Sequence, residues 1–294
     1  MPALTCAPLL TEGPSGRVLL RISGAEAKAF LNALVSNDVT AVTPDRAVYA
    51  ALLTPQGKFL HDMLVVGSEG GGLLLDVAVE RAGDLKRRLT LYKLRSKIEI
   101  DALDWQGFAL FGSDDTAPQV GGEAVLFRDP RLAALGWRLW LPPEATPDLP
   151  IAGPEAYERH RLALGVPDGA RDIEPEKGLL LENHFEDLHG VDFAKGCYIG
   201  QELTARTKYR GLVKKQLYRV AAADDAVLPP PGTPVRLDGQ DAGEMRSSFG
   251  NIGLALLRLD AVGNALQSGQ PLESGGMALT PDRPDYAGPL PAKE

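Results

Sequence analysis

The sequence predicts an α+β fold followed by a small β-barrel or β-sandwich at the C-terminal end. Its 294 residues, 44% hydrophobic and 24% charged, are typical of a soluble globular protein with two or three substructures. Strand-like and helix-like segments are mixed and include a hairpin, which favours α+β over a doubly wound sheet. From Leu212 onward, short β-type runs alternate with Gly and Pro turns, as in a barrel or sandwich.

The N-terminal half begins with a predicted strand and an amphipathic helix. Residues 18–22 form an apolar β-type run, and the next four residues, Ser-Gly-Ala-Glu, have the pattern of a capping box. Apolar residues at helical spacing then predict a helix over 24–35, ended by a polar turn at 36–39. Two β-rich runs, 47–53 and 59–66, follow and are joined by Thr-Pro-Gln-Gly, which predicts a hairpin.

The remaining elements follow from the same periodicities. We expect strands at 73–79, 98–103 and 137–141, a helix through Leu85, Leu89 and Tyr92, a second helix at 156–164, and barrel strands at 217–221, 234–237 and 252–257. The sequence contains no Gly-rich phosphate-binding motif, so a nucleotide-binding function lacks its usual support.

The most informative segment is KGCYIGQE, residues 195–202. Cys197 lies between glycines, and Lys195 precedes it by two residues. A nearby cation favours the thiolate, and glycines allow a ligand to approach the sulfur. The alternative is a small buried cysteine in a tight turn, but the surrounding Lys, Gln and Glu side chains favour a reactive thiol over a core position.

A second polar anomaly is Asp62, which lies in an apolar strand. Strict alternation places it on one face with Leu60, Leu64 and Val66. A carboxylate in such a row is costly unless it is paired or contacts a ligand. Either Asp62 binds backbone at a half-buried edge, or it serves a ligand; the close turn of the preceding hairpin favours the ligand.

Charge and composition exclude several functions. The net charge of −8 argues against general nucleic-acid binding. Seven basic residues between 195 and 219, opposed by Glu202 alone, favour an anionic ligand beside the cysteine. A second basic run is interpreted as a solvated face; it comprises Lys86, Arg87, Arg88, Lys93, Arg95 and Lys97.

The cysteine and histidine content predicts neither a disulfide framework nor a tightly held metal. Cys6 and Cys197 are the two cysteines, and the four histidines are scattered. No apolar run approaches the ~20 residues of a membrane span, and the first residues match neither a secretory signal nor a transit peptide. We therefore expect a cytoplasmic protein without a membrane partner.

The cysteine segment also resembles a known signature. KGCYIGQE, with Gly-Val-Asp-Phe at 190–193 before it and Thr-Ala-Arg at 204–206 and Arg-Gly at 210–211 after it, resembles the signature of the folate-binding YgfZ family. Proteins of this family are relatives of the T-protein, the aminomethyltransferase of the glycine cleavage system. The order of the N-terminal elements is also similar, and the resemblance covers roughly residues 15–285.

The resemblance implies a T-protein-like ring of three domains around a central channel that binds tetrahydrofolate or a one-carbon derivative. The expected divisions are a folate-binding region of two interleaved subdomains at 1–211, a C-terminal β-barrel at 212–284 and a flexible tail at 285–294. The implied function is assembly or repair of [4Fe–4S] clusters. The implied partners are iron–sulfur assembly proteins and client enzymes, including radical enzymes that modify tRNA.

The resemblance also assigns residues. Cys197 would be the reactive or catalytic thiol, and Asp62 would contact the pterin. The remaining folate contacts would come from Asn37, Lys195, Gln201, Glu202, Arg206 and Lys208, with Arg206 and Lys208 holding the anionic glutamate tail.

Two departures bear on function. The T-protein has paired acids where this chain has His61-Asp62, so only the second acid remains and aminomethyl transfer is doubtful. His184 replaces an Asn that is usual in the family. One alternative is a folate-dependent one-carbon transferase, in which Asp62 acts as a base or an electrostatic anchor. Another is a non-catalytic scaffold that docks a partner through its barrel.

Overall fold

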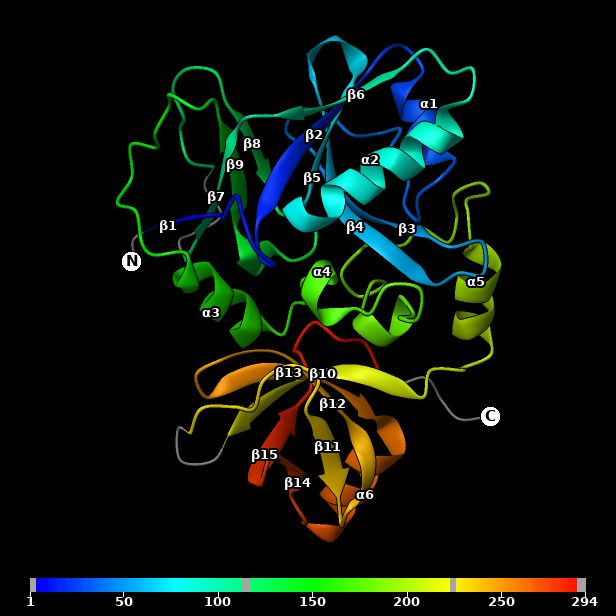
Figure 1. The fold of residues 1–294 in the computed structure, drawn as a ribbon, viewed down its shortest axis with the longest axis vertical. Helices are drawn as coiled ribbons and strands as arrows, with labels where there is room; N and C mark the ends of the chain where they lie inside the picture. Colours follow the sequence, from blue (N-terminus) through cyan, green and yellow to red (C-terminus); the bar gives the residue numbers. More distant parts are fainter. Residues whose placement is uncertain (1–3, 113–116, 223–225, 290–294) are drawn as a thin grey trace.

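The computed structural model describes residues 4–112, 117–222 and 226–289 and contains two antiparallel sheets and a closed barrel (Figure 1). The first sheet has the order β3-β4-β5-β2-β6 and consists of β2 (Arg17–Ser23), β3 (Val48–Leu53), β4 (Phe59–Gly67), β5 (Leu73–Ala78) and β6 (Glu99–Leu103). The second has the order β1-β7-β9-β8 and consists of β1 (Thr5–Pro8), β7 (Gln106–Phe111), β8 (Val125–Arg128) and β9 (Trp137–Leu141).

The C-terminal substructure is a closed barrel. Together with the two sheets and their helices, it confirms the predicted α+β fold with a C-terminal barrel. Its strands are β10 (Lys215–Ala222), β11 (Pro234–Leu237), β12 (Gln240–Phe249), β13 (Ile252–Arg258), β14 (Leu272–Ser274) and β15 (Met277–Asp282). The helices are α1 (Ala27–Asn32), α2 (Val79–Lys93), α3 (Glu155–Leu164), α4 (Gly169–Asp172), α5 (Gln201–Tyr209) and α6 (Leu259–Ser268), with short 3-10 helices η1 (Glu69–Gly71), η2 (Ala133–Leu135) and η3 (Leu181–Asn183).

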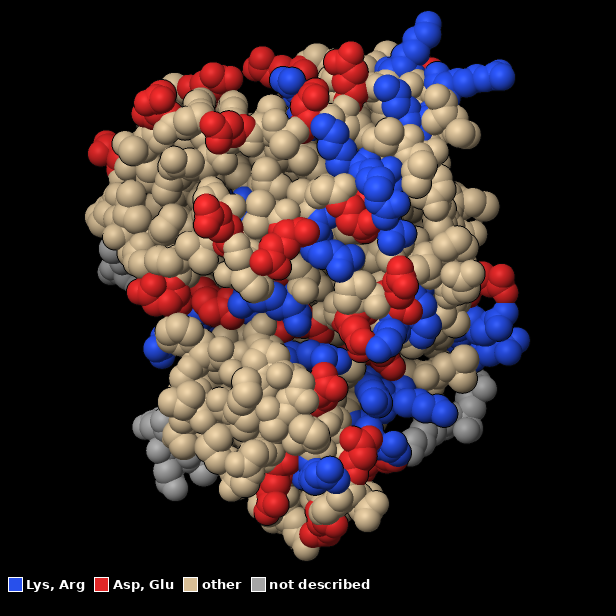
Figure 2. Space-filling view, in the orientation of Figure 1, with Lys and Arg blue, Asp and Glu red and all other residues tan. Residues whose placement is uncertain are grey.

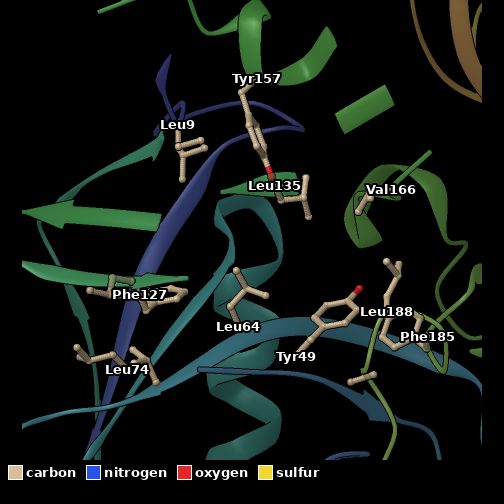
Figure 3. Close-up of a cluster of buried hydrophobic side chains, with 14 of the residues drawn as sticks. Leu9, Tyr49, Leu64, Leu74, Phe127, Leu135, Tyr157, Val166, Phe185 and Leu188 are labelled. Carbon is tan, nitrogen blue, oxygen red and sulfur yellow. The ribbon is translucent and has the colours of Figure 1, made fainter. Parts of the chain in front are cut away.

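The two sheets pack against each other through one hydrophobic core. Leu64 and Leu74 of the first sheet belong to the same buried cluster as Phe127 and Trp140 of the second. Figure 3 shows Leu64 and Tyr49 on neighbouring strands, with Tyr157 reaching toward them from α3. This intersheet face is where any inward-pointing charged residue must find a partner or a ligand.

The outer face of the first sheet is covered by α1 and α2. Met63 and Leu75 of the sheet share a buried cluster with Leu31 of α1 and Leu85 of α2. The helices α3 and α4 lie between the sheets and the barrel (Figure 1). The first sheet therefore separates a helix-covered outer face from an inner face that looks toward the second sheet.

The strand assignments made from periodicity are confirmed within one or two residues, but the capping box is wrong. Ser23 is the last residue of β2, and α1 begins only at Ala27 without a side-chain cap. The Glu26 carboxylate instead accepts a hydrogen bond from the backbone N–H of Lys97, at 2.8 Å. A tertiary contact thus replaces the local cap.

The alternation expected along the second hairpin strand is also only partly correct. Leu64 and Val66 lie in the intersheet core and Met63 and Val65 in the outer one, as strict alternation predicts. The pairing of β3 with β4 shifts between Leu52 and Leu53, however, and this irregularity exchanges the faces of Phe59 and Leu60. Asp62 lies beyond the shift and keeps its predicted face.

The C-terminal segment returns to the N-terminal region. The Tyr286 hydroxyl donates to the carbonyl of Gly165 at 2.7 Å, and the Gly288 N–H donates to Asp187 at 3.0 Å. This differs from the flexible tail expected from 285 onward; residues 290–294 of that prediction lie outside the described ranges. His184, the family departure, lies between the Asp187 carboxylate and the Leu217 carbonyl and so connects η3 to the barrel strand β10.

Candidate functional site

A cavity of about 260 Å³ lies between the two sheets, and residues of α3, of the α4 region and of the barrel complete its lining. The first sheet contributes Arg17 and Asp62, and the second contributes Arg138. Tyr157 projects from α3, and Phe249 of β12 brings the barrel into the lining. Because all three substructures meet at this cavity, it corresponds to the centre of the fold.

Asp62 lies at the base of the cavity. Its side chain is buried, and the Tyr49 hydroxyl donates a hydrogen bond to Oδ2 at 3.1 Å. The start of α4 presses against it so closely that a Cβ atom on Gly169 would lie 2.3 Å from Oδ1. A glycine is therefore required at position 169 for the carboxyl group to occupy its place.

The electrostatics of this carboxyl group are unusual. Burial raises the pKa of Asp62; Arg17 opposes the shift, and the charge of Asp168 adds to it. The ionised form therefore costs stability in the folded chain. A buried acid with few internal hydrogen bonds that lines a cavity has the character of a ligand contact.

Five arginines line the cavity, and four of them form short ion pairs with acids. The pairs are Arg17 with Asp76 at 2.7 Å, Arg131 with Asp129 at 2.7 Å, Arg161 with Asp172 at 2.9 Å and Arg171 with Glu158 at 2.6 Å. The lining consequently provides oriented hydrogen-bond donors rather than a strong positive potential.

Arg138 differs from the other four because its ion pair is longer and one of its donors has no partner among the described residues. It is buried on β9, donates to the Tyr157 hydroxyl at 2.5 Å and lies 3.4 Å from Asp129. Its Nη1 has no hydrogen-bond partner among the described residues, and neither has Asp76 Oδ2. An unsatisfied buried donor costs about 1–3 kcal/mol, so Arg138 is held in this position at a cost in stability.

Cys197 lies outside the cavity lining, and its thiol is exposed and unpaired. Its loop leads into α5 through Gly200, whose φ is 80°. A Cβ on Gly200 would lie 2.5 Å from the Thr54 carbonyl oxygen, and one on Gly57 would lie 2.7 Å from the Gly200 carbonyl oxygen. The cysteine loop therefore packs directly on the β3–β4 hairpin, and the two glycines permit that contact.

Lys195 anchors this loop. Its Nζ donates to the backbone carbonyls of Asn32, Val35 and Asn37, each at 2.8 Å, where α1 and its following turn end. Burial lowers the pKa of Lys195 to about 8, although Asp38 and Asp192 oppose the shift. The ammonium is thus occupied by backbone oxygens and holds the loop to the first sheet.

Asn37 continues this connection toward the cavity. Its Nδ2 donates to the backbone carbonyls of Tyr49, at 2.8 Å, and of His189, at 2.7 Å. Because Lys195 binds the Asn37 carbonyl and Tyr49 binds Asp62, hydrogen bonds link the cysteine loop to the cavity through Asn37 and Tyr49. The structure thereby brings Asn37, Lys195 and Asp62 into one network, although only Asp62 lines the cavity.

The other predicted folate contacts lie on α5, away from the cavity lining. Gln201 accepts a hydrogen bond from the Tyr198 N–H at 3.0 Å and so supports the start of the helix. Glu202 pairs with Arg206 on the helix surface, and Lys208 pairs with Glu186. A ligand in the cavity would therefore need other residues for an anionic tail.

The arginines and Tyr157 of the cavity were not predicted from the sequence. A signal was present for Arg138, because it interrupts the apolar strand 137–141 in the same way that Asp62 interrupts its own strand. Arg17, immediately before a predicted strand, was less conspicuous. Within the described ranges, no group of three or more His, Cys, Asp or Glu side chains could hold a metal ion.

The fold and the C-terminal domain are both similar to those of known proteins. The fold superposes on the crystal structure of the glycine cleavage system aminomethyltransferase T from Bartonella henselae with a TM-score of 0.74 and 14% identity, covering 97% of this chain and 86% of that one. Residues 214–289 match the family described as the CAF17 C-terminal beta-barrel domain. The chain is thus an aminomethyltransferase-fold protein with a CAF17-type barrel.

The sequence relatives then define the family. The chain is 35% identical to the Homo sapiens iron-sulfur cluster assembly factor IBA57, mitochondrial, and 34% identical to its Mus musculus counterpart, covering 92% of this chain and 83% of each relative. The homologue from Pyricularia oryzae is 33% identical. The chain belongs to the IBA57 family of iron–sulfur cluster assembly factors, close to the YgfZ family that the motif resembles.

The relatives also correct one expectation. Each of these three proteins is named as mitochondrial, which contradicts the cytoplasmic location predicted from the sequence. Among the described residues, no helix combines the length and the apolar character that a membrane span requires.

The raised pKa of Asp62 gives a first prediction. Because the folded pKa exceeds the ordinary value of about 3.9, Asp62 lowers stability as pH rises through the window between the two. Asp62→Asn removes this penalty, so its Tm at neutral pH should exceed that of the wild type by about 2–4 °C per kcal/mol relieved. The difference should shrink toward pH 3–4 in thermal scans. A lower Tm for the variant at neutral pH would show that the ionised carboxylate stabilises the fold.

The two thiols give a second prediction. Cys6 is fully buried, and burial raises its pKa to about 11, whereas Cys197 is exposed. An alkylating reagent at neutral pH should modify Cys197 at least about tenfold faster than Cys6 in the folded protein, and the two at similar rates in denaturant. Mass spectrometry of timed samples measures both sites. Comparable rates in the folded protein would contradict the placement of Cys6 in the core.

Proposed function

We propose that this protein acts in iron–sulfur cluster assembly and holds a reduced folate, tetrahydrofolate or a one-carbon derivative, in the intersheet cavity. The observation that carries the proposal is the buried Asp62 carboxyl group, which lines the same cavity as Arg138. The family supports the role in cluster assembly, since the relatives are named for that function.

A reduced pterin matches this pair of groups. The ring carries adjacent N–H donors on one edge, which suit a carboxylate, and a carbonyl oxygen, which suits an arginine N–H. The cavity of about 260 Å³ is slightly smaller than typical drug-sized pockets of about 300–1,000 Å³. It would therefore enclose the pterin and leave the benzoyl-glutamate portion near the mouth.

Cys197 has a separate role in this proposal. Its exposed thiol lies on the loop that Lys195 holds to the first sheet, outside the cavity lining. An exposed thiol can meet a partner protein, and it would be the reactive or redox-sensitive group in contact with the assembly proteins or with [4Fe–4S] clients, including radical enzymes that modify tRNA. The cluster is cargo here and not a resident cofactor.

A second candidate is a folate-dependent one-carbon transferase. It is favoured by the raised pKa of Asp62, since a carboxyl group shifted toward neutrality is a better proton acceptor, and by the aminomethyltransferase fold. Turnover of an amine donor with tetrahydrofolate would support this candidate. The absence of one acid of the T-protein pair weakens it, because His61 occupies that position and pairs with Asp84 of α2 at 2.9 Å.

Folate binding is tested by calorimetric titration of the purified chain with tetrahydrofolate and with oxidised folic acid. Asp62→Asn and Asp62→Ala should weaken binding of the reduced form about ten- to hundredfold, because a hydrogen bond to a charged buried group contributes roughly 1.5–3 kcal/mol. Glu69→Gln, which neutralises an exposed acid of η1, is the matched control and should bind like the wild type. Equal affinities for Asp62→Asn and the wild type would remove folate from this cavity.

The role in cluster assembly is tested in a strain that lacks the gene. The wild-type gene should restore the activity of [4Fe–4S] enzymes, and Cys197→Ala should not, although its Tm stays close to that of the wild type because the exposed thiol fills no core space. Cys6→Ala, which creates a small buried cavity, is the control for stability and should rescue. Full rescue by Cys197→Ala would exclude a chemical role for this thiol.

A further inference from the structure

The C-terminal end of α2 and the turn after it form a surface that the proposed function does not use. We propose that this surface, residues 86–97 and here called the α2 patch, docks onto an anionic lipid bilayer as a peripheral contact. Two independent features carry the inference: a concentration of exposed apolar side chains and a group of cations without ion-pair partners among the described residues.

The apolar component is unusually exposed. Leu94 is 89% exposed, Leu91 65% and Tyr92 41%. Nine large apolar side chains are exposed among the described residues, and three of them lie within the four positions 91–94. Single exposed apolar residues need no explanation, but a cluster of them marks an interaction site.

The cationic component lies in the same segment of the chain. Lys86, Lys93, Arg95 and Lys97 have no ion-pair partner among the described residues, whereas Arg87 and Arg88, on the same helix, both pair with Asp84. Figure 2 shows Lys and Arg side chains gathered over α2 and its C-terminal end. On a chain of net charge −8, such a local excess of free positive charge attracts an anionic surface.

The backbone at Leu94 supports a functional surface. Leu94, the residue that follows α2, has φ 46° and ψ −105°, a conformation that leucine rarely adopts, and its side chain is exposed to solvent. Strained backbone of this kind persists where the surroundings or the function require it. Insertion of the Leu94 side chain into a bilayer would be a function that accounts for the strained backbone at this turn.

A lipid surface fits this chemistry better than the other anionic partners. In this proposal the exposed Leu91 and Leu94 side chains would enter the acyl region, while the lysine and arginine side chains would reach the headgroups and Tyr92 would lie at the interface. Nucleic acid would use the cations and leave Leu91 and Leu94 without a function. An acidic protein would have to supply a pocket for a projecting leucine, which requires a dedicated partner.

The position of the α2 patch suits a peripheral contact. α2 covers the outer face of the first sheet, and no residue of the α2 patch lines the intersheet cavity. Docking there would leave the cavity mouth free for a ligand. The basic run of α2, interpreted from sequence as a solvated face, is thereby reinterpreted as a surface that becomes desolvated on docking.

The experiment measures co-sedimentation of the full chain with vesicles of phosphatidylcholine alone and of phosphatidylcholine with phosphatidylserine. Binding should occur only to the anionic vesicles and should weaken with salt. Each of Lys93→Gln, Arg95→Gln and Lys97→Gln should weaken binding about fivefold. Leu91→Gln combined with Leu94→Gln should reduce it at least tenfold at constant charge.

Matched controls lie elsewhere on the surface. Leu266→Gln on α6, 74% exposed, tests an apolar residue outside the α2 patch, and Arg210→Gln tests an exposed cation; both should bind like the wild type. Absence of vesicle binding, or binding unaffected by the leucine substitutions, would overturn the proposal. So would retention on single-stranded DNA or polyglutamate that depends on the cations alone. None of these outcomes affects folate binding or cluster assembly, which are measured separately.

Discussion

The structure depends on the neutralisation of charge buried between the two sheets. Arg138 spans the gap, since it lies on the second sheet and approaches Asp76 of the first to 4.0 Å while contacting Asp129 and Tyr157 on its own side. Removing one member of such a network would leave an uncompensated buried charge, at a cost of about 3–5 kcal/mol. The network therefore links the two sheets at the place where the cavity lies between them.

This constraint explains why Asp62 can remain an acid. Arg17 partly offsets the burial of its carboxyl group, yet burial and Asp168 still raise its pKa. A hydrophobic residue at position 62 would pack more favourably beside Tyr49 and Leu64, so the acid is retained at the expense of stability. Such a cost is typical of functional sites, where local rules of foldability are broken for the sake of a ligand.

Much of the fold could be predicted from the sequence, but the site could be predicted only in part. Strands such as 137–141 and the β3–β4 hairpin follow from periodicity, and Asp62 was visible as a carboxylate in an apolar row. The capping box failed because Glu26 has a long-range partner, the Lys97 N–H, that no local pattern reveals. Asp76, the partner of Arg17, is distant in sequence, and Asp172, the partner of Arg161, follows the turn after α3. Only the packed structure therefore shows that these arginines meet at one cavity. Lys195 was expected beside the thiol, but three backbone carbonyls take up its charge.

The cavity and the exposed thiol are distinct sites on a shared element. β4 carries Asp62 at its centre, and the hairpin that begins it supports the Cys197 loop through the contact of Gly57 with Gly200. Hydrogen bonds from Lys195 through Asn37 and Tyr49 follow the same route to Asp62. A ligand that donates hydrogen bonds to Asp62 would compete with the hydrogen bond from the Tyr49 hydroxyl at one end of this route. The cysteine loop lies at the other end. If the proposed function holds, this arrangement would keep the ligand in the cavity apart from the partner at the thiol, while the β3–β4 hairpin connects the two places.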